Sequence, residues 1–125
     1  MAEQSPLLNF TVIDQLKSLS KGDDDTFLVE LCERFVGNSA DTLQIMTDAA
    51  QRGDREHLSR LSHRLCGSAL NVGAVKVAAL CHEWELRCKK GLPVVDSEIS
   101  ELEQLLSLTR DALYEHLIPT SNPAE

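Results

Sequence analysis

Apolar residues recur at steps of three and four along most of this chain, a spacing that places them on one face of an α-helix. The longest run follows Asp23–Asp25, whose carboxylates can cap a helix N-terminus, and it stops at Gly53, a residue type that commonly ends helices. Its apolar positions are Leu28, Leu31, Cys32, Phe35, Leu43, Met46, Ala49 and Ala50. The pattern predicts one long helix between these two signals.

Three more helices are predicted after this one. Asp54 caps the first, which ends at Gly73. The second ends at Gly91, and Asp96 caps the third. Their inward positions are, helix by helix, Leu58, Leu61, Leu65, Ala69 and Val72; then Val77, Leu80, Cys81, Trp84 and Cys88; then Ile99, Leu102, Leu106, Leu113 and Leu117.

A short helix is also predicted near the N-terminus. Thr11 and Asp14 form a weak variant of a capping box there, and Gly22 would stop the helix. Short connections join the four longer helices, so these bury their apolar faces most simply by packing antiparallel around one core. We expect an all-α fold, an up-down-up-down four-helix bundle with a short additional N-terminal helix.

The composition is that of a soluble globular chain. Of its 125 residues, 42% are hydrophobic and 26% are charged, which indicates a single domain spanning residues 1–125, with a core of about residues 7–117 and flexible termini. No apolar run reaches the roughly 18 residues that span a bilayer, and the opening residues lack the pattern of a secretory signal. The formal charge of -8 disfavours contact with nucleic acid or an anionic membrane. A bundle with satisfied faces is expected to be a monomer.

The cysteines fall inside helical patterns, so we expect reduced, buried thiols. They are Cys32, Cys66, Cys81 and Cys88. A zinc site is the alternative, because His63 and Cys66 lie three residues apart and could place ligands on one side of a helix. However, Cys81 and Cys88 fall on the inward stripe whereas His82 points outward, so the set cannot converge on an ion without unwinding a helix. We expect no metal.

His63 lies on the outer side of the helix predicted between Asp54 and Gly73. At about 100° of rotation per residue it points roughly 160° away from the centre of the apolar stripe, and therefore toward water. Arg60 lies one turn before it and Gly67 one turn after it, with Leu70 beyond. Glycine inside a helix costs roughly 1 kcal/mol relative to alanine. At Gly67 it clears space beside the imidazole, so that a bulky partner can approach.

The residues around His63 resemble the signature of histidine-containing phosphotransfer (HPt) domains of multistep two-component phosphorelays. That signature is His-x-Leu-Lys-Gly-Ser followed by small residues and Gly-Ala, and residues 63–74 here read HRLCGSALNVGA. Leu8–Leu16, Phe27–Phe35 and Ala79–Glu85 are also similar to the corresponding segments of such domains. The resemblance covers about residues 7–117.

This resemblance implies that His63 is the phosphoacceptor, a phosphohistidine that carries a phosphoryl group between the aspartates of two receiver domains. The receiver would supply the divalent metal, so the chain needs no cofactor of its own and is a carrier rather than an autonomous enzyme. We find no P-loop and no Gly-rich phosphate cradle, and hence no kinase or ATP site. An exposed histidine is largely neutral at pH 7, so a ring nitrogen has a lone pair for attack on phosphorus.

One residue departs from the family pattern. Cys66 stands where the family usually has Lys or Arg, so a cation that steadies the phosphoryl group is missing. Arg60 lies on nearly the same face as His63 and Arg64 lies at its edge, and we expect Arg60 to substitute. With Cys66, Gly67 and Leu70, these arginines form the predicted surface for phosphate and receiver.

Two interpretations of function stay open at this point. The first is the phosphorelay carrier, and the alternative is a non-phosphorylated HPt-like adaptor that binds a receiver or another regulatory protein through the same face. The resemblance also implies a cytoplasmic location, either for a free-standing protein or for the C-terminal domain of a membrane-bound hybrid sensor histidine kinase. The donor and acceptor receivers are not determined by the residues.

Overall fold

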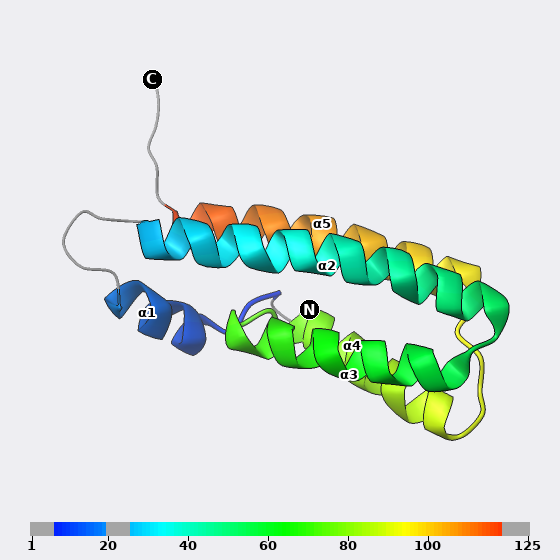
Figure 1. Cartoon of the computed structure of the whole chain (residues 1–125). Coiled ribbons are helices and arrows are strands. Elements are labelled where there is room, and N and C mark those ends of the chain that lie inside the picture. The colour runs from blue at the N-terminus through cyan, green and yellow to red at the C-terminus, as the bar shows by residue number, and fades with distance from the viewer. Residues whose placement is uncertain (1–6, 20–25, 119–125) are drawn as a thin grey trace, which may run out of the picture.

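The computed structural model describes residues 7–19 and 26–118, which form five helices. They are α1 (Phe10–Ser18), α2 (Thr26–Arg52), α3 (Arg55–Asn71), α4 (Val75–Lys89) and α5 (Asp96–Leu117). In Figure 1, α2 to α5 run in alternating directions, with α2 beside α5 and α3 beside α4, while the short α1 lies at one end. The predicted all-α bundle with an additional N-terminal helix is therefore confirmed.

The helix ends are where the glycines predicted them. Gly53, Gly73 and Gly91 adopt φ angles of 72°, 76° and 78°, a region that only glycine enters without steric cost. At the start of α3, the Asp54 side chain accepts a hydrogen bond of 3.1 Å from the backbone N–H of His57, as an N-cap should. These local signals separate α2, α3 and α4 from one another.

Two predicted caps were wrong by one or two positions. The N-cap of α1 is Asn9, whose side chain accepts from the Thr11 N–H at 3.0 Å, so the helix begins before Thr11. Asp96 is the first residue of α5 rather than its cap, and the Glu98 carboxylate instead accepts from the backbone N–H of Val95 at 3.0 Å. Helix α1 ends at Ser18. The predicted stop at Gly22, the caps at Asp23–Asp25 and the flexible termini before residue 7 and after residue 118 lie outside the described residues.

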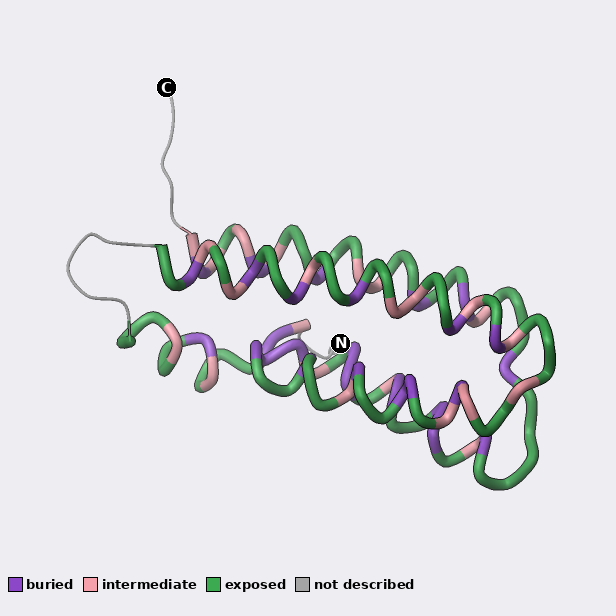
Figure 2. Tube along the Cα trace, viewed as in Figure 1, coloured by how far each residue is buried: buried purple, intermediate pink, exposed green. Residues whose placement is uncertain are grey.

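The core lies between the α2–α5 pair and the α3–α4 pair (Figure 2). Most of the predicted inward positions are buried, and Trp84 and Leu102 are fully enclosed. Exceptions such as Leu80 and Leu106 are half-buried at the edge of the core. Burial of apolar area at roughly 25 cal/mol per Å² is the main force that holds the four long helices together. Their packing leaves the opposite faces, including the outer face of α3, in water.

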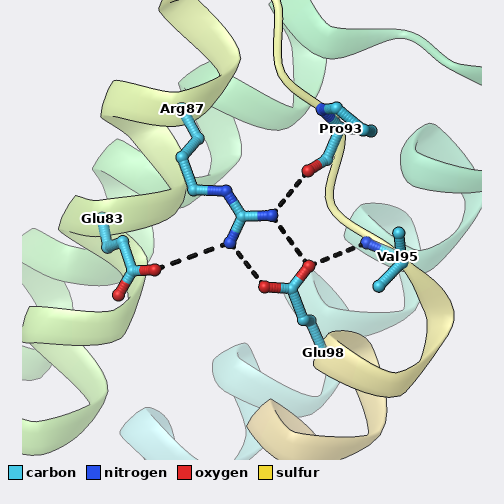
Figure 3. Close-up of polar contacts among 5 residues, drawn as sticks. All are labelled: Glu83, Arg87, Pro93, Val95 and Glu98. Carbon is cyan, nitrogen blue, oxygen red and sulfur yellow. Dashed lines mark hydrogen bonds and ion pairs between the residues drawn. The ribbon is translucent and has the colours of Figure 1, made fainter.

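Arg87 joins α4 to the loop and helix that follow it (Figure 3). Its guanidinium forms a bidentate ion pair with Glu98 of α5, with one contact of 2.8 Å, and also donates to the Pro93 carbonyl oxygen at 2.6 Å. Hydrogen bonds from Arg87 hold the pKa of the Glu98 carboxyl below its ordinary value. Both side chains are about a quarter exposed, so solvent screens this pair less than an open surface pair.

Arg87→Ala is expected to lower the free energy of unfolding by about 2 kcal/mol at pH 7, because Glu98 and Pro93 lose their charged partner. The Glu98 pKa is lowered in the folded chain, so this contribution is present above the ordinary carboxyl value of 4.5 and is lost as the pH falls through the lowered pKa. Urea unfolding of both chains between pH 3 and pH 7 measures the difference. Arg110→Ala, which removes an exposed pair with Asp111, is the control. A difference that does not depend on pH would contradict this assignment.

Candidate functional site

His63 points away from the core, as the rotation along α3 predicted. Its side chain is 73% exposed, whereas Leu61 and Leu65 on the opposite face are buried. The helix is held in this rotation by its inward leucines, so the imidazole has no freedom to turn into the bundle without exposing them. His63 is therefore accessible to another macromolecule.

A carboxylate from α4 meets the His63 ring. Both oxygens of Glu85 lie 3.2 Å from Nδ1, and the Glu85 side chain is only 10% exposed. Helices α3 and α4 run antiparallel, which brings together two residues that are 22 positions apart in the sequence. Glu85 was not among the predicted site residues. Its one local signal is a carboxylate directly after Trp84, at the edge of the inward stripe of α4.

Glu85 has a second partner in Lys89, one turn along the same helix. The Lys89 ammonium lies 3.0 Å from the carboxylate oxygen Oε2. The hydrogen bond from Lys89, followed by that from His63, lowers the pKa of the Glu85 carboxyl, while its partial burial acts in the opposite direction. Glu85 is therefore ionised at neutral pH and can only accept hydrogen bonds.

This ionised acceptor selects the tautomer of His63. Because Glu85 can only accept, Nδ1 carries the proton and donates it to the carboxylate. In the neutral form of the ring the lone pair is then on Nε2, for which the described residues show no hydrogen-bond partner. A histidine oriented through one nitrogen with the other free is suited to act as a nucleophile.

Three predicted neighbours of His63 lie on the same outer face of α3. Gly67 is exposed, and a Cβ built there would meet nothing within 4 Å, so the space beside the imidazole is open. Leu70 is 52% exposed and extends the same face. Arg60 also lies on it, and its guanidinium is 3.5 Å from the Glu56 carboxylate one turn earlier.

Arg64 and Cys66 lie on the two flanks of the α3 face. Arg64 is exposed and lines a groove between α2 and α3 together with Ser68 and Ile45. Cys66 lies on the other flank, toward α4, and is half-buried, so the expectation that all four thiols are buried was wrong at this position. Burial, and to a lesser extent the negative charge of Glu85, raises the pKa of the Cys66 thiol. Cys66 is therefore a neutral group beside the histidine.

The remaining thiols lie in the core. Cys32, Cys81 and Cys88 are buried and free. Within residues 7–19 and 26–118, no group of three or more His, Cys, Asp or Glu side chains is placed to hold a metal ion. No helix in these ranges is both long and apolar enough to cross a membrane.

The fold and the family comparison together define a phosphotransfer domain. The family model of the Hpt domain matches residues 30–112, and the chain belongs to this family. It thus has a histidine phosphotransfer role in a phosphorelay, for which receiver domains are the expected class of partner.

Among solved structures, the crystal structure of histidine-containing phosphotransfer protein B (HptB) from Pseudomonas aeruginosa PAO1 is similar. It superimposes with a TM-score of 0.80 at 26% sequence identity, over 94% of this chain and 100% of the HptB chain. The similarity therefore extends beyond the family match to include nearly the whole bundle. Comparison with curated proteins finds no match.

Proposed function

We propose that His63 is the phosphoacceptor of this chain, which acts as a single-domain phosphocarrier between the aspartates of receiver domains. The observation that best supports this proposal is the orientation of one exposed imidazole. Nδ1 is 3.2 Å from both oxygens of Glu85, while the side chain is 73% exposed. Nε2 is the nitrogen that a receiver can reach.

In the proposed reaction, the Nε2 lone pair attacks the phosphorus of an aspartyl phosphate in line with the leaving oxygen. An N–P bond forms while the P–O bond to the aspartate breaks, and its electron pair stays with the aspartate, which leaves as a carboxylate. No proton leaves Nε2, so no general base is needed. The ring keeps its Nδ1 proton and gains positive charge, which the Glu85 carboxylate stabilises. Transfer to the next receiver reverses these steps.

The receiver is proposed to cover the α3 face around His63. Gly67 leaves room for it, Leu70 offers an apolar contact, and Arg60 and Arg64 offer positive charge to an acidic partner surface. Cys66 lies within the same contact area. The receiver supplies the divalent metal that offsets the negative charge of the transferred group. We propose a cytoplasmic location and a monomeric chain.

Incubation with a receiver that carries labelled aspartyl phosphate tests this proposal. We expect label on this chain that is lost in acid and retained in alkali, as a phosphoramidate bond to histidine requires, and mass spectrometry of the digested chain should place it on His63. Binding of the receiver without label would instead support an adaptor that carries no phosphate. Label on another residue would contradict the choice of His63.

A further inference from the structure

A phosphoryl group on His63 brings a charge of roughly -2 to the surface of α3, and charge-assisted hydrogen bonds from a cation are the usual means of holding it. Position 66 supplies none, because the Cys66 thiol is neutral. The cation has to come from another position. Three candidates lie around the imidazole: Arg60, Arg64 and Lys89.

Lys89 is the candidate that the structure connects to His63. Its ammonium is 3.0 Å from Oε2 of Glu85, and the same oxygen is 3.2 Å from Nδ1 of His63. The Lys89 ammonium is therefore no farther from Nδ1 than the sum of these two distances, and it lies on the α4 side of the ring. The side chain of Lys89 is 61% exposed, so it has room to move toward solvent.

The two arginines are less well placed. Arg60 is 63% exposed and extends back toward Glu56, its partner at 3.5 Å. Arg64 follows His63 directly, so it points about 100° around the helix, and it lines the groove on the α2 side of α3. Glu85 and Lys89 lie on the α4 side. The predicted substitution of the missing cation by Arg60 therefore has less support than one by Lys89.

We propose that Lys89 binds the phosphoryl group on His63 and so replaces, from α4, the cation that Cys66 does not supply on α3. This inference rests on the proposed role of His63. An ammonium has three N–H donors on a flexible stem, and the Lys89 side chain is 61% exposed, so it can swing from Glu85 toward a phosphoryl oxygen on Nε2. No bond is made or broken by Lys89, which stabilises the charge of the transferred group before and after transfer.

Four variants of the full chain test the proposal: Lys89→Ala, Lys89→Arg, Cys66→Lys and the double variant Lys89→Ala with Cys66→Lys. The measurements are the rate of label transfer from a phosphorylated receiver and the lifetime of the label on the chain. Loss of a charge-assisted hydrogen bond predicts a roughly ten- to hundredfold slower transfer for Lys89→Ala. Lys89→Arg should keep most of the rate, and Cys66→Lys should restore transfer to the Lys89→Ala chain by returning the charge to α3.

The control is Lys90→Ala, an exposed lysine at the end of α4, and Arg60→Ala tests the competing cation. Lys90→Ala should transfer at the wild-type rate. Wild-type transfer by Lys89→Ala would overturn the proposal, as would a loss in Arg60→Ala that exceeds the loss in Lys89→Ala. If Lys89→Ala is slow and Cys66→Lys does not restore it, Lys89 serves only to hold Glu85, and the proposal is equally overturned. If the wild-type chain takes no label, the proposed role of His63 is contradicted, and the proposal for Lys89 is contradicted with it.

Discussion

His63→Gln is expected to abolish transfer of label from a phosphorylated receiver, because an amide nitrogen has no lone pair available for attack on phosphorus. Glutamine can still donate a hydrogen bond to Glu85, and the side chain it replaces is 73% exposed. The free energy of unfolding should therefore change by no more than about 0.5 kcal/mol. A time course of transfer to both chains, with urea unfolding alongside it, measures the two effects separately.

The matched control for this variant is His82→Gln. His82 is an exposed histidine on the neighbouring helix α4, and it is not among the residues of the proposed site. It should accept label at the wild-type rate. Retention of label by His63→Gln, or its loss in His82→Gln, would show that another group is the phosphoacceptor.

Gly67→Leu is expected to reduce transfer at least a hundredfold without loss of stability. Attack on phosphorus requires the reacting atoms to come within about 3–3.5 Å, and a misplacement of about 1 Å can cost about a hundredfold in rate. A leucine one turn from His63 would hold the receiver off by more than that. A Cβ at this position meets nothing within 4 Å, so the fold itself accepts the change. The helix propensity of leucine should even raise the free energy of unfolding, by up to about 1 kcal/mol.

A graded series sharpens this experiment. Gly67→Ala adds one methyl group and should slow transfer much less than Gly67→Leu. Ser107→Leu adds comparable bulk at an exposed position of α5, which packs against α2 and α4, and should transfer normally. Transfer by Gly67→Leu at the wild-type rate would mean that the receiver does not approach across this part of α3.

The main helices were predictable because each depends on signals that lie close together in the chain. The inward stripes of α2 to α5 follow the 3.6-residue period, and their separations follow glycines that adopt positive φ. The start of α1 was not predicted, since Asn9 and Thr11 are both able to cap a helix. Which of the two residues caps α1 depends on a tertiary contact: the Asn9 N–H donates to the carbonyl oxygen of Gly73, in the turn after α3, at 2.7 Å.

The site likewise has features that depend on nearby residues and features that depend on packing between helices. The outward rotation of His63, Gly67 and Leu70 was predictable, because it is the complement of the inward stripe of one helix. The thiol at Cys66 was expected to be buried like the others, but the edge of α3 that faces α4 is only partly covered. Partial burial of this kind depends on how closely two helices approach, which one helical period does not reveal.

The order of residues alone was sufficient to identify the helices, the outward histidine and the family signature, because all three are properties of short segments. The partners of that histidine were decided by the packing of α3 against α4, which sets an antiparallel register between segments 22 residues apart and brings Glu85 to Nδ1. Lys89 follows Glu85 by one helical turn and reaches the same carboxylate. Register across an interface depends on side-chain packing over its whole length, so it is known only once both helices are in place.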